Sequence, residues 1–548
     1  MLSDTFKRFI KFAWFLPGFL LWAVFPPMGE RMDVVFALAP LMWLSRRTDD
    51  SRRSAKLWFA NGFFFWAVTL SWMPAIVKNG GPWPLVVLGW GALAAYCAAY
   101  FAAYGWFSAK YWQWAKFSSQ SNGPYWKRLL GILLVEPVLW CGLELVRSRL
   151  FGGFAWNQLG VAAVNAGLGT PAALGGVYLC SACIVLVNGT IAGIAERMWH
   201  PERSGFPALK RWGALETLLA FGVVWGIYGA SSVQSNNQTI KQSNSALKVA
   251  MVQRNFPCCF KEQAENPYGV YDRLLANVAM LNPDLVVLPE SAMCEFGAVD
   301  RQGAVRFAEW VAKKTGGAAL LAGGTRYEGG KTYNSAALYT VVSNRLQATA
   351  VDCYDKVHLV PFGEFIPGDK LVPALQKLAP VGSCTPGALK LLPLSTSTSF
   401  LHLGCAICFE DTDSALMREF RRRGARVLFF ITNDSWFSQS VEAEQHAWQA
   451  VARAIETGLP VVRVGNNGVT GTITPDGKAS WLIGPKGKPL VDKEGTMFDK
   501  VTIRSTPTPT PYTFFGDWPL GIVFALLILA LILVKYHSTY EKRRSMSM

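Results

Sequence analysis

Long runs of apolar residues dominate the first 230 positions and return once near the C-terminus. A helix needs roughly 20 mostly apolar residues to cross a bilayer. The pattern predicts eight such segments, at 12–27, 32–44, 57–77, 83–106, 129–145, 171–194, 212–230 and 518–534. The first two are short, so a re-entrant pair is their alternative. We expect a multi-pass α-helical membrane domain with about eight transmembrane helices.

A block of different pattern lies between the seventh and eighth apolar segments. Short apolar, β-branched runs are typical of strands and occur at 248–253, 284–289, 318–322, 335–342, 400–408, 427–432 and 460–464. Helical patterns cover 271–281, 305–314 and 442–457. Strands that alternate with helices predict an α/β domain whose helices cover the faces of a sheet.

Polar segments mark the expected boundaries. Residues 1–230 form the predicted transmembrane domain with seven spans, and the polar stretch 231–245 is a linker. The α/β domain takes up 246–505, and the Pro/Thr-rich stretch 506–517 is a stiff second linker. The last span, 518–534, leads into a tail at 535–548.

Charge decides the orientation. The chain has 53 Lys and Arg against 37 Asp and Glu, a net charge of +16. The cations concentrate after the second, fourth, sixth and eighth apolar segments, within 46–56, 110–128, 197–211 and 535–544. Loops rich in Lys and Arg stay in the cytoplasm. Both termini are therefore expected inside and the α/β domain outside, and the positive charge no longer calls for a nucleic-acid partner.

Cysteine and histidine give little evidence of a metal. The eleven Cys are scattered, and Cys258 and Cys259 are too close in sequence to bridge each other easily. Cys353 and Cys384 could pair in an oxidising compartment. The five His lack the spacing of metal ligands, so we expect no metal and no cofactor.

Three strand ends carry reactive groups. Glu290 ends an apolar strand, Lys356 follows another, and Cys408 ends a third. Functional groups in α/β folds gather beyond the carboxyl ends of strands, so these three are expected to converge. Each residue alone has an ordinary structural explanation, and their joint appearance carries the argument.

The strings around these residues are distinctive. Pro289-Glu290-Ser291, the stretch from Lys356 to Glu364 and Cys408-Phe409-Glu410 together resemble the nitrilase superfamily. With the flanking spans, the chain resembles the apolipoprotein N-acyltransferases of the bacterial inner membrane. The strings at 144–147, 153–158, 432–437, 453–456 and 466–470 agree. Two departures are Phe409, where the family commonly has Tyr, and the absence of Trp from 254–262.

The resemblance implies an αββα nitrilase-like sandwich for 246–505, on the periplasmic side of the inner membrane. It also implies a Glu290–Lys356–Cys408 triad, since a thiol needs a base or a cation to become a nucleophile. Glu290 would take the thiol proton, and Lys356 would stabilise the oxyanion with help from the backbone N–H of Phe409. Glu364 and Glu410 would support the site. Trp156, Asn433 and Trp436 are the expected substrate contacts.

The implied reaction has two steps. Cys408 would take the sn-1 acyl chain of a phospholipid, typically phosphatidylethanolamine, as a thioester. The α-amine of the diacylglyceryl-Cys of an apolipoprotein would then accept the chain, which gives a triacylated lipoprotein by a ping-pong mechanism. The expected partners are this phospholipid, apolipoproteins and the bilayer.

Two alternatives stay open. A membrane-tethered amidase would use the same triad with water as acceptor, although a soluble amide would not require eight spans. A transporter or receptor would show functional charges inside the spans. Glu136 and Glu144 are the exceptions in an otherwise apolar fifth span. Glu144 could pair with Arg147 one turn away, and the sequence assigns no role to Glu136.

Overall fold

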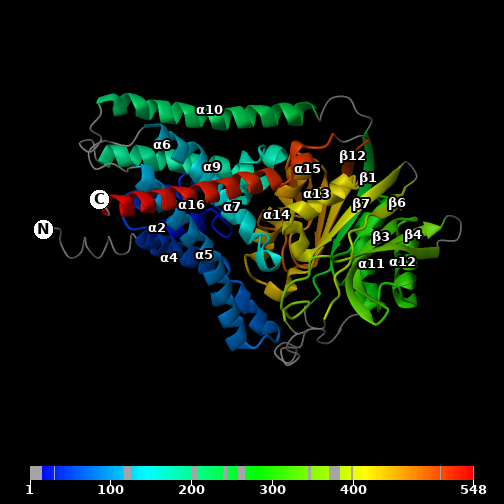
Figure 1. The fold of residues 1–548 in the computed structure, drawn as a ribbon. Helices are drawn as coiled ribbons and strands as arrows, with labels where there is room; N and C mark the ends of the chain where they lie inside the picture. The colour runs from blue at the N-terminus through cyan, green and yellow to red at the C-terminus, as the bar shows by residue number, and fades with distance from the viewer. Residues whose placement is uncertain are drawn as a thin grey trace. The chain divides into compact units, whose positions relative to one another are not determined.

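The computed structural model describes residues 15–29, 31–115, 125–199, 207–237, 244–256, 266–342, 347–368, 383–396, 399–505 and 508–546 (Figure 1). The chain forms two compact units. The first comprises Met1–Ser71, Val87–Gln234 and Phe515–Met548, and the second comprises Trp72–Val86 and Ser235–Phe514. Residues 72–86, which fall within or between two predicted spans, therefore pack with the second unit.

Helices make up the described part of the first unit. They are α2 (Leu16–Ala23), α3 (Ala39–Arg46), α4 (Ser51–Thr69), α5 (Trp83–Ala115), α6 (Tyr125–Leu130), α7 (Glu136–Arg147), α8 (Leu159–Ala163), α9 (Ala172–Trp199), α10 (Pro207–Asn237) and α16 (Trp518–Met546). Among the residues that the structure describes, four helical stretches are long and apolar enough to cross a membrane: Ser51–Asn79, Trp83–Ala115, Tyr125–Arg147 and Ala172–Met198. They coincide with the third to sixth predicted spans, and a membrane domain is confirmed.

The ends of this unit differ from the expectation. Helices α2 and α3, in the first two predicted spans, have eight residues each, fewer than a bilayer crossing needs. In the described residues they fit the re-entrant alternative better than two full spans. Helix α10 continues to Asn237, well into the stretch expected to be a linker. A short helix, α15 (Pro511–Phe515), occupies part of the Pro/Thr-rich stretch.

Two buried carboxylates of the first unit, Glu136 and Glu144, are bound by other groups of the protein. Glu136 forms an ion pair with Arg46, and its Oε1 also accepts a hydrogen bond of 2.8 Å from Trp112 Nε1. Glu144 accepts hydrogen bonds from Leu159 N at 2.8 Å and from Ser181 Oγ at 2.7 Å. These contacts join helices, because charge in an apolar bundle must be matched within the protein.

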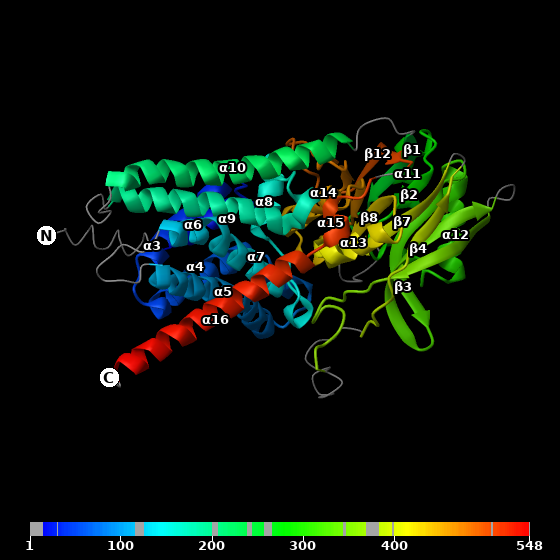
Figure 2. The same ribbon diagram turned by 45° about the horizontal axis from the view of Figure 1, so that its top comes forward.

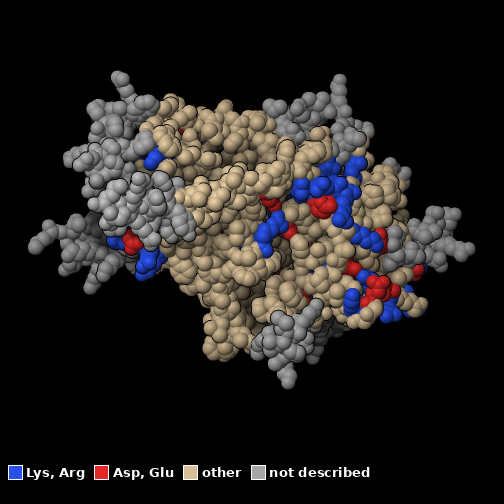
Figure 3. All heavy atoms as spheres, in the orientation of Figure 1, with Lys and Arg blue, Asp and Glu red and all other residues tan. Residues whose placement is uncertain are grey.

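Part of the described surface of this unit is strongly apolar. On the face shown in Figure 3, hardly any charged side chain lies over the described parts of α10 and α16. Leu526 and Leu533 of α16 are about three-fifths exposed, as are Leu218 and Phe221 of α10. Large apolar side chains turned outward are what a lipid environment selects.

Two six-stranded sheets build the second unit. The order of the first is β12-β1-β2-β3-β4-β5, with bounds Gly495–Arg504, Asn244–Gln253, Leu285–Val287, Ala319–Glu328, Lys331–Val342 and Gln347–Asp355. The order of the second is β11-β10-β9-β8-β7-β6, with bounds Ala479–Trp481, Gly471–Ile473, Val461–Gly465, Val427–Thr432, Phe400–Ile407 and Leu392–Ser395. Strands β1, β2 and β3 are parallel, as are β7, β8 and β9.

Helices cover the outer faces of both sheets, as Figures 1 and 2 show. Helices α11 (Pro267–Ala279) and α12 (Gln302–Lys314) share an apolar core with the first sheet. Helices α13 (Ser414–Arg422) and α14 (Glu442–Thr457) pack on the second sheet. The unit is therefore the expected αββα sandwich. Its parallel strands end near Glu290, Cys408 and Asn433, so their carboxyl ends position the candidate site.

Candidate active site

The nucleophile candidate lies in a tight turn after β7. The last five residues of β7 are buried, and the turn Cys408–Thr412 follows at once. Cys408 has a left-handed backbone with φ of 54°. An L-residue with a side chain adopts this conformation at a cost of about 1–3 kcal/mol, so surrounding contacts must hold it.

Glu410 supplies one of these contacts. Its Oε1 accepts hydrogen bonds from Tyr354 Oη at 2.8 Å, Val357 N at 2.8 Å and His358 N at 3.0 Å. Its Oε2 accepts from Ile407 N at 2.9 Å. The carboxylate therefore ties the turn of Cys408 to the segment that follows Lys356.

Lys356 follows β5 and is 1% exposed. Its backbone N donates to Asn334 O at 2.8 Å, and its Nζ lies 3.0 Å from Glu364 Oε1. Glu364 is itself held, because its Oε2 accepts a hydrogen bond of 2.7 Å from Val360 N. The eight-residue separation in sequence is thus closed by an ion pair.

Glu290 follows β2 and is 7% exposed. Its Oε1 accepts a hydrogen bond of 2.7 Å from Asn334 Nδ2, and the same nitrogen donates to Glu364 Oε1 at 2.7 Å. The backbone at Glu290 lies against Gly323 of β3, where a Cβ would come within 2.6 Å of Glu290 Cα. Only glycine fits at that position.

Burial and charge set the protonation of the three groups. Burial raises the pKa of the Cys408 thiol well above its ordinary value, and Glu290 adds to the rise while Lys356 opposes it. Burial also raises the pKa of Glu290, against Lys356 and the Asn334 hydrogen bond. Burial alone would lower the pKa of Lys356, but Glu364, Cys408 and Glu290 outweigh it and raise the pKa. The resting site therefore holds a neutral thiol beside an ammonium group.

Hydrogen bonds join Glu290, Glu364 and Lys356 through Asn334. Cys408 lies close enough for the charges of Glu290 and Lys356 to act on its thiol. A protonated thiol next to a buried carboxylate of raised basicity suits proton transfer at the moment of attack. The ammonium of Lys356 suits a developing negative charge. The arrangement can perform acyl chemistry at sulfur.

Other cysteines are less suited to the role. Cys405, on the same strand as Cys408, is fully buried, and burial followed by Glu410 raises the pKa of its thiol. Cys353 and Cys384 are free thiols, so the disulfide considered for them does not form in this structure. Cys258 and Cys259 lie outside the described residues.

The predicted substrate contacts are placed differently from one another. Trp156 belongs to the first unit and is only 2% exposed. Asn433 directly follows β8, and its Oδ1 accepts hydrogen bonds from Ser435 Oγ at 2.7 Å and Asn466 Nδ2 at 2.9 Å. Trp436 is 44% exposed. Phe409 lies in the turn Cys408–Thr412, where its carbonyl accepts a hydrogen bond of 2.8 Å from Thr412 Oγ1.

Two features of the second unit were not expected from the sequence. Asn334 bridges two carboxylates of the site, although an Asn inside a strand gives no signal of its own. Residues 72–79 pack on the turn after β8: Trp72 meets Phe437 with ring centroids 4.6 Å apart, and Asn79 Nδ2 donates to Trp436 O at 2.9 Å. The sequence did not predict this contact, because the apolar composition of 57–77 indicated a membrane span.

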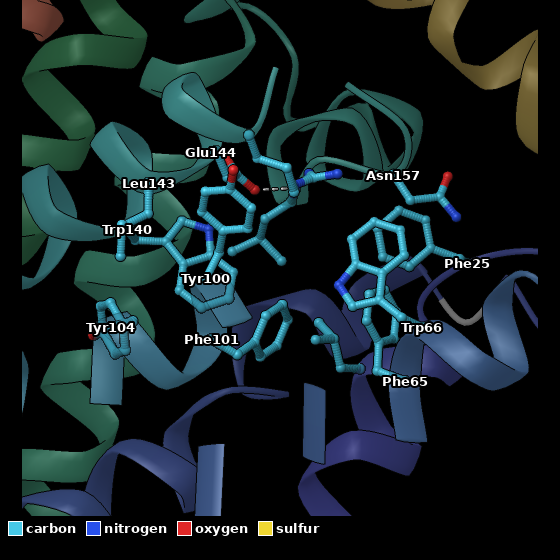
Figure 4. A pocket seen from close by; sticks show the side chains of 13 residues that line it. Phe25, Phe65, Trp66, Tyr100, Phe101, Tyr104, Trp140, Leu143, Glu144 and Asn157 are labelled. Atoms are coloured by element: carbon cyan, nitrogen blue, oxygen red, sulfur yellow. Dashed lines mark hydrogen bonds between the residues drawn. The ribbon is translucent and has the colours of Figure 1, made fainter. Parts of the chain in front are cut away.

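A cavity in the first unit contains none of the triad residues. Figure 4 shows it between α4, α5 and α7, with aromatic side chains on most of its wall. The lining includes Phe25, Phe65, Trp66, Tyr100, Phe101, Tyr104 and Trp140. Glu144, Arg147 and Asn157 add polar groups.

One buried group of the described residues has the composition of a cation site. Candidate ligand atoms of Asp434, Glu442 and His446 lie within 4.8 Å of one another. Asp434 and His446 are already paired with each other, however, and Arg463 brings a further positive charge to Asp434. The donors are therefore matched by protein cations.

The chain matches two family models. Residues 17–190 match the apolipoprotein N-acyltransferase N-terminal domain, and residues 248–503 match the carbon-nitrogen hydrolase model. An amidase from Nesterenkonia sp. is 17% identical, with a TM-score of 0.35 over 50% of this chain and 95% of that one.

Curated relatives extend over most of the chain. An apolipoprotein N-acyltransferase from Geobacter metallireducens is 30% identical over 473 residues, 84% of each chain. One from Photobacterium profundum is 27% identical over 96% of this chain and 97% of that one. The chain belongs to the apolipoprotein N-acyltransferase family.

Proposed function

We propose that this protein transfers a fatty acyl chain from the sn-1 position of a phospholipid to the N-terminal amine of a diacylglyceryl apolipoprotein. The observation that carries the proposal is the hydrogen-bonded chain from Glu290 through Asn334 and Glu364 to Lys356, beside Cys408. Membership of the family supplies the substrate classes.

In the first step the sulfur of Cys408 attacks the ester carbonyl. Glu290 takes the thiol proton as the new C–S bond forms, and Lys356 stabilises the negative charge on the carbonyl oxygen. The ester C–O bond then breaks, and Glu290 returns the proton to the leaving oxygen of the lysophospholipid. The product is a thioester on Cys408.

In the second step the α-amine of the apolipoprotein attacks the thioester. The C–N bond forms, the C–S bond breaks, and Glu290 carries the amine proton to the sulfur. A thioester reacts readily with amines, and two acceptors that use one site in turn imply ping-pong kinetics.

The placement in the cell is part of the proposal. We assign residues 1–230, apart from the stretch 72–86 that packs with the second unit, and residues 518–534 to the bacterial inner membrane. Residues 246–505 are assigned to the periplasm, and both termini, including 535–548, to the cytoplasm. The four long apolar helices of the described residues support the placement in a membrane. The distribution of Lys and Arg supports the orientation. Phosphatidylethanolamine is the proposed donor, and Trp156, Asn433 and Trp436 stay proposed contacts to its chains or to the apolipoprotein.

A double-label assay tests the proposal. The full chain in detergent micelles is incubated with phosphatidylethanolamine that carries different isotopes in its two acyl chains, together with a diacylglyceryl lipopeptide. The expected product is the lipopeptide with the sn-1 label on its amine. Labelled free fatty acid without an N-acylated peptide would instead identify a hydrolase.

Matched variants make this assay specific. Lys356→Ala is expected to lower the rate by at least about 10²–10³-fold, as for a lost oxyanion donor. Lys331→Ala, at the exposed start of β4, removes the same charge away from the site and serves as its control. Full activity of Lys356→Ala would contradict the assigned role.

A further inference from the structure

Four charged side chains form a closed, buried ring beneath the turn of Cys408. His446 Nδ1 lies 2.9 Å from Asp434 Oδ1, and His446 Nε2 lies 3.1 Å from Asp411 Oδ1. Arg463 completes the ring through an ion pair with Asp411 and a 3.6 Å contact to Asp434 Oδ2. None of the four is more than 2% exposed.

Each member of the ring comes from a different element. Asp411 lies in the turn Cys408–Thr412, and Asp434 opens the turn Asp434–Phe437 after β8. His446 is on α14 and Arg463 on β9. Two consecutive residues therefore hold the nucleophile turn from two directions, since Glu410 binds the segment after Lys356 and Asp411 binds this ring.

The ring is balanced in charge. Two carboxylates face two cations. Burial and then Asp434 raise the pKa of Glu442, a third acid 3.5 Å from His446 Nδ1, well above its ordinary value, which disfavours a third negative charge there. Burial alone would lower the pKa of His446, but Asp411 and Asp434 raise it to about 10 against Arg463. His446 is therefore an imidazolium at neutral pH.

Asp434 connects the ring to the thiol. Burial contributes most to the raised pKa of Cys408, and Asp434 contributes along with Glu290 and Glu364 against Lys356. The Asp434 carboxylate lies against Gly468, where a Cβ would come within 1.9 Å of its Oδ2, so a larger residue does not fit there. Asp434 is 2% exposed, and a buried charge must be balanced by neighbouring groups of the protein.

We infer that His446 is a positioning residue of this site: its imidazolium joins the turn of Cys408 to the turn of Asp434 and cancels the Asp434 charge that opposes the Cys408 thiolate. The inference rests on Cys408 as the proposed nucleophile. Its test measures the reactivity of the Cys408 thiol directly and does not require acyl transfer.

The test is the rate of Cys408 alkylation by iodoacetamide across pH, measured on the full chain by peptide mass spectrometry. His446→Gln is expected to move the midpoint upward by about one pH unit, which lowers the rate near pH 8 about 10-fold. His446→Gln with Asp434→Asn removes the uncancelled charge and is expected to recover the rate to within about 3-fold. His402→Gln, at an exposed position of β7, is expected to change nothing.

An unchanged midpoint in a folded His446→Gln protein would overturn the inference, and so would a double variant that recovers nothing. If His446→Gln does not fold, we expect the double variant to fold, because it restores the charge balance of the ring. A double variant that does not fold either would overturn the inference. A normal alkylation profile with no acyl adduct would refute the proposed function alone.

Discussion

Asn334 Nδ2 donates a hydrogen bond of 2.7 Å to Glu290 Oε1 and thereby fixes which oxygen of this carboxylate remains available. The second hydrogen of the same amide goes to Glu364. An amide can satisfy two carboxylates at once without adding charge. Asn334 thus holds Glu290 and Glu364 close together, so that Glu290 can serve as the base while Glu364 pairs with Lys356.

Loss of this amide should slow the acylation of Cys408. Asn334→Ala is expected to reduce the acylation rate about 10–100-fold, because a hydrogen bond to a charged group is worth about 1.5–3 kcal/mol. Single-turnover formation of the acyl-enzyme measures the effect. Ser335→Ala, which removes a hydrogen bond of 2.6 Å to Asp355 from the next residue of β4, is the control. Equal acylation rates for the two variants would show that Asn334 has no specific role in the site.

The pH dependence of acylation follows from Glu290. Burial raises its pKa, so the basic form accumulates only above the pH at which an ordinary Glu ionises, and the rate should rise with pH through that raised pKa. The Asn334 hydrogen bond favours the ionised form of Glu290. Asn334→Ala should therefore shift the rise of the rate to still higher pH. A pH profile of acyl-enzyme formation tests both statements.

Glu290→Gln provides the reference for this profile. In this variant the rise of the acylation rate with pH should disappear. The rate itself should fall about 10²–10⁴-fold, as for a lost general base. A rise that persists in Glu290→Gln would assign the titration to another group.

Glu410 should matter for stability as well as rate. Gln at this position keeps one acceptor oxygen and replaces the other with an NH₂ group. That NH₂ would face a backbone N–H that donates to the carboxylate in the native protein, so two donors would meet without an acceptor. Glu410→Gln is expected to lose about 1–3 kcal/mol of stability, the cost of a buried donor left without an acceptor. Thermal unfolding in detergent measures it. Glu419→Gln, on the half-exposed face of α13, should leave the melting temperature within about a degree.

Much of the second unit could be predicted from the sequence, because local patterns determine it. Helix α14 has the predicted bounds, and the strands that lead to Glu290 and Cys408 stand where β-branched runs indicated them. Asn334 and His446 could not be found in this way. Their roles depend on which strands and turns lie side by side, and on neighbours more than ten residues away in the chain.

The membrane part shows a different limit. Hydropathy located four long helices correctly, but it cannot tell a short re-entrant helix from a span. It also could not show that residues 72–79 pack with the second unit, since Trp72 looks like a membrane residue until its contacts with Phe437 and Gln445 are seen. Nor did sequence reasoning find a partner for Glu136, because Arg46 is ninety residues away.

The Arg46–Glu136 pair should be essential as a pair and replaceable as a whole. Both side chains are almost fully buried, and loss of one partner leaves a charge without compensation, at a cost of about 3–5 kcal/mol in known cases. Glu136→Gln is expected to lower thermal stability in detergent strongly. Arg46→Met combined with Glu136→Leu should recover most of it. A double variant as unstable as the single one would show that the pair does more than cancel charge.

The most direct test of the account is the mass of the protein after exposure to phospholipid alone. We expect an added fatty acyl group on the peptide that contains Cys408, lost in Cys408→Ala and retained in Cys405→Ala. An adduct that depends on Cys405, or none at all despite release of lysophospholipid, would contradict it.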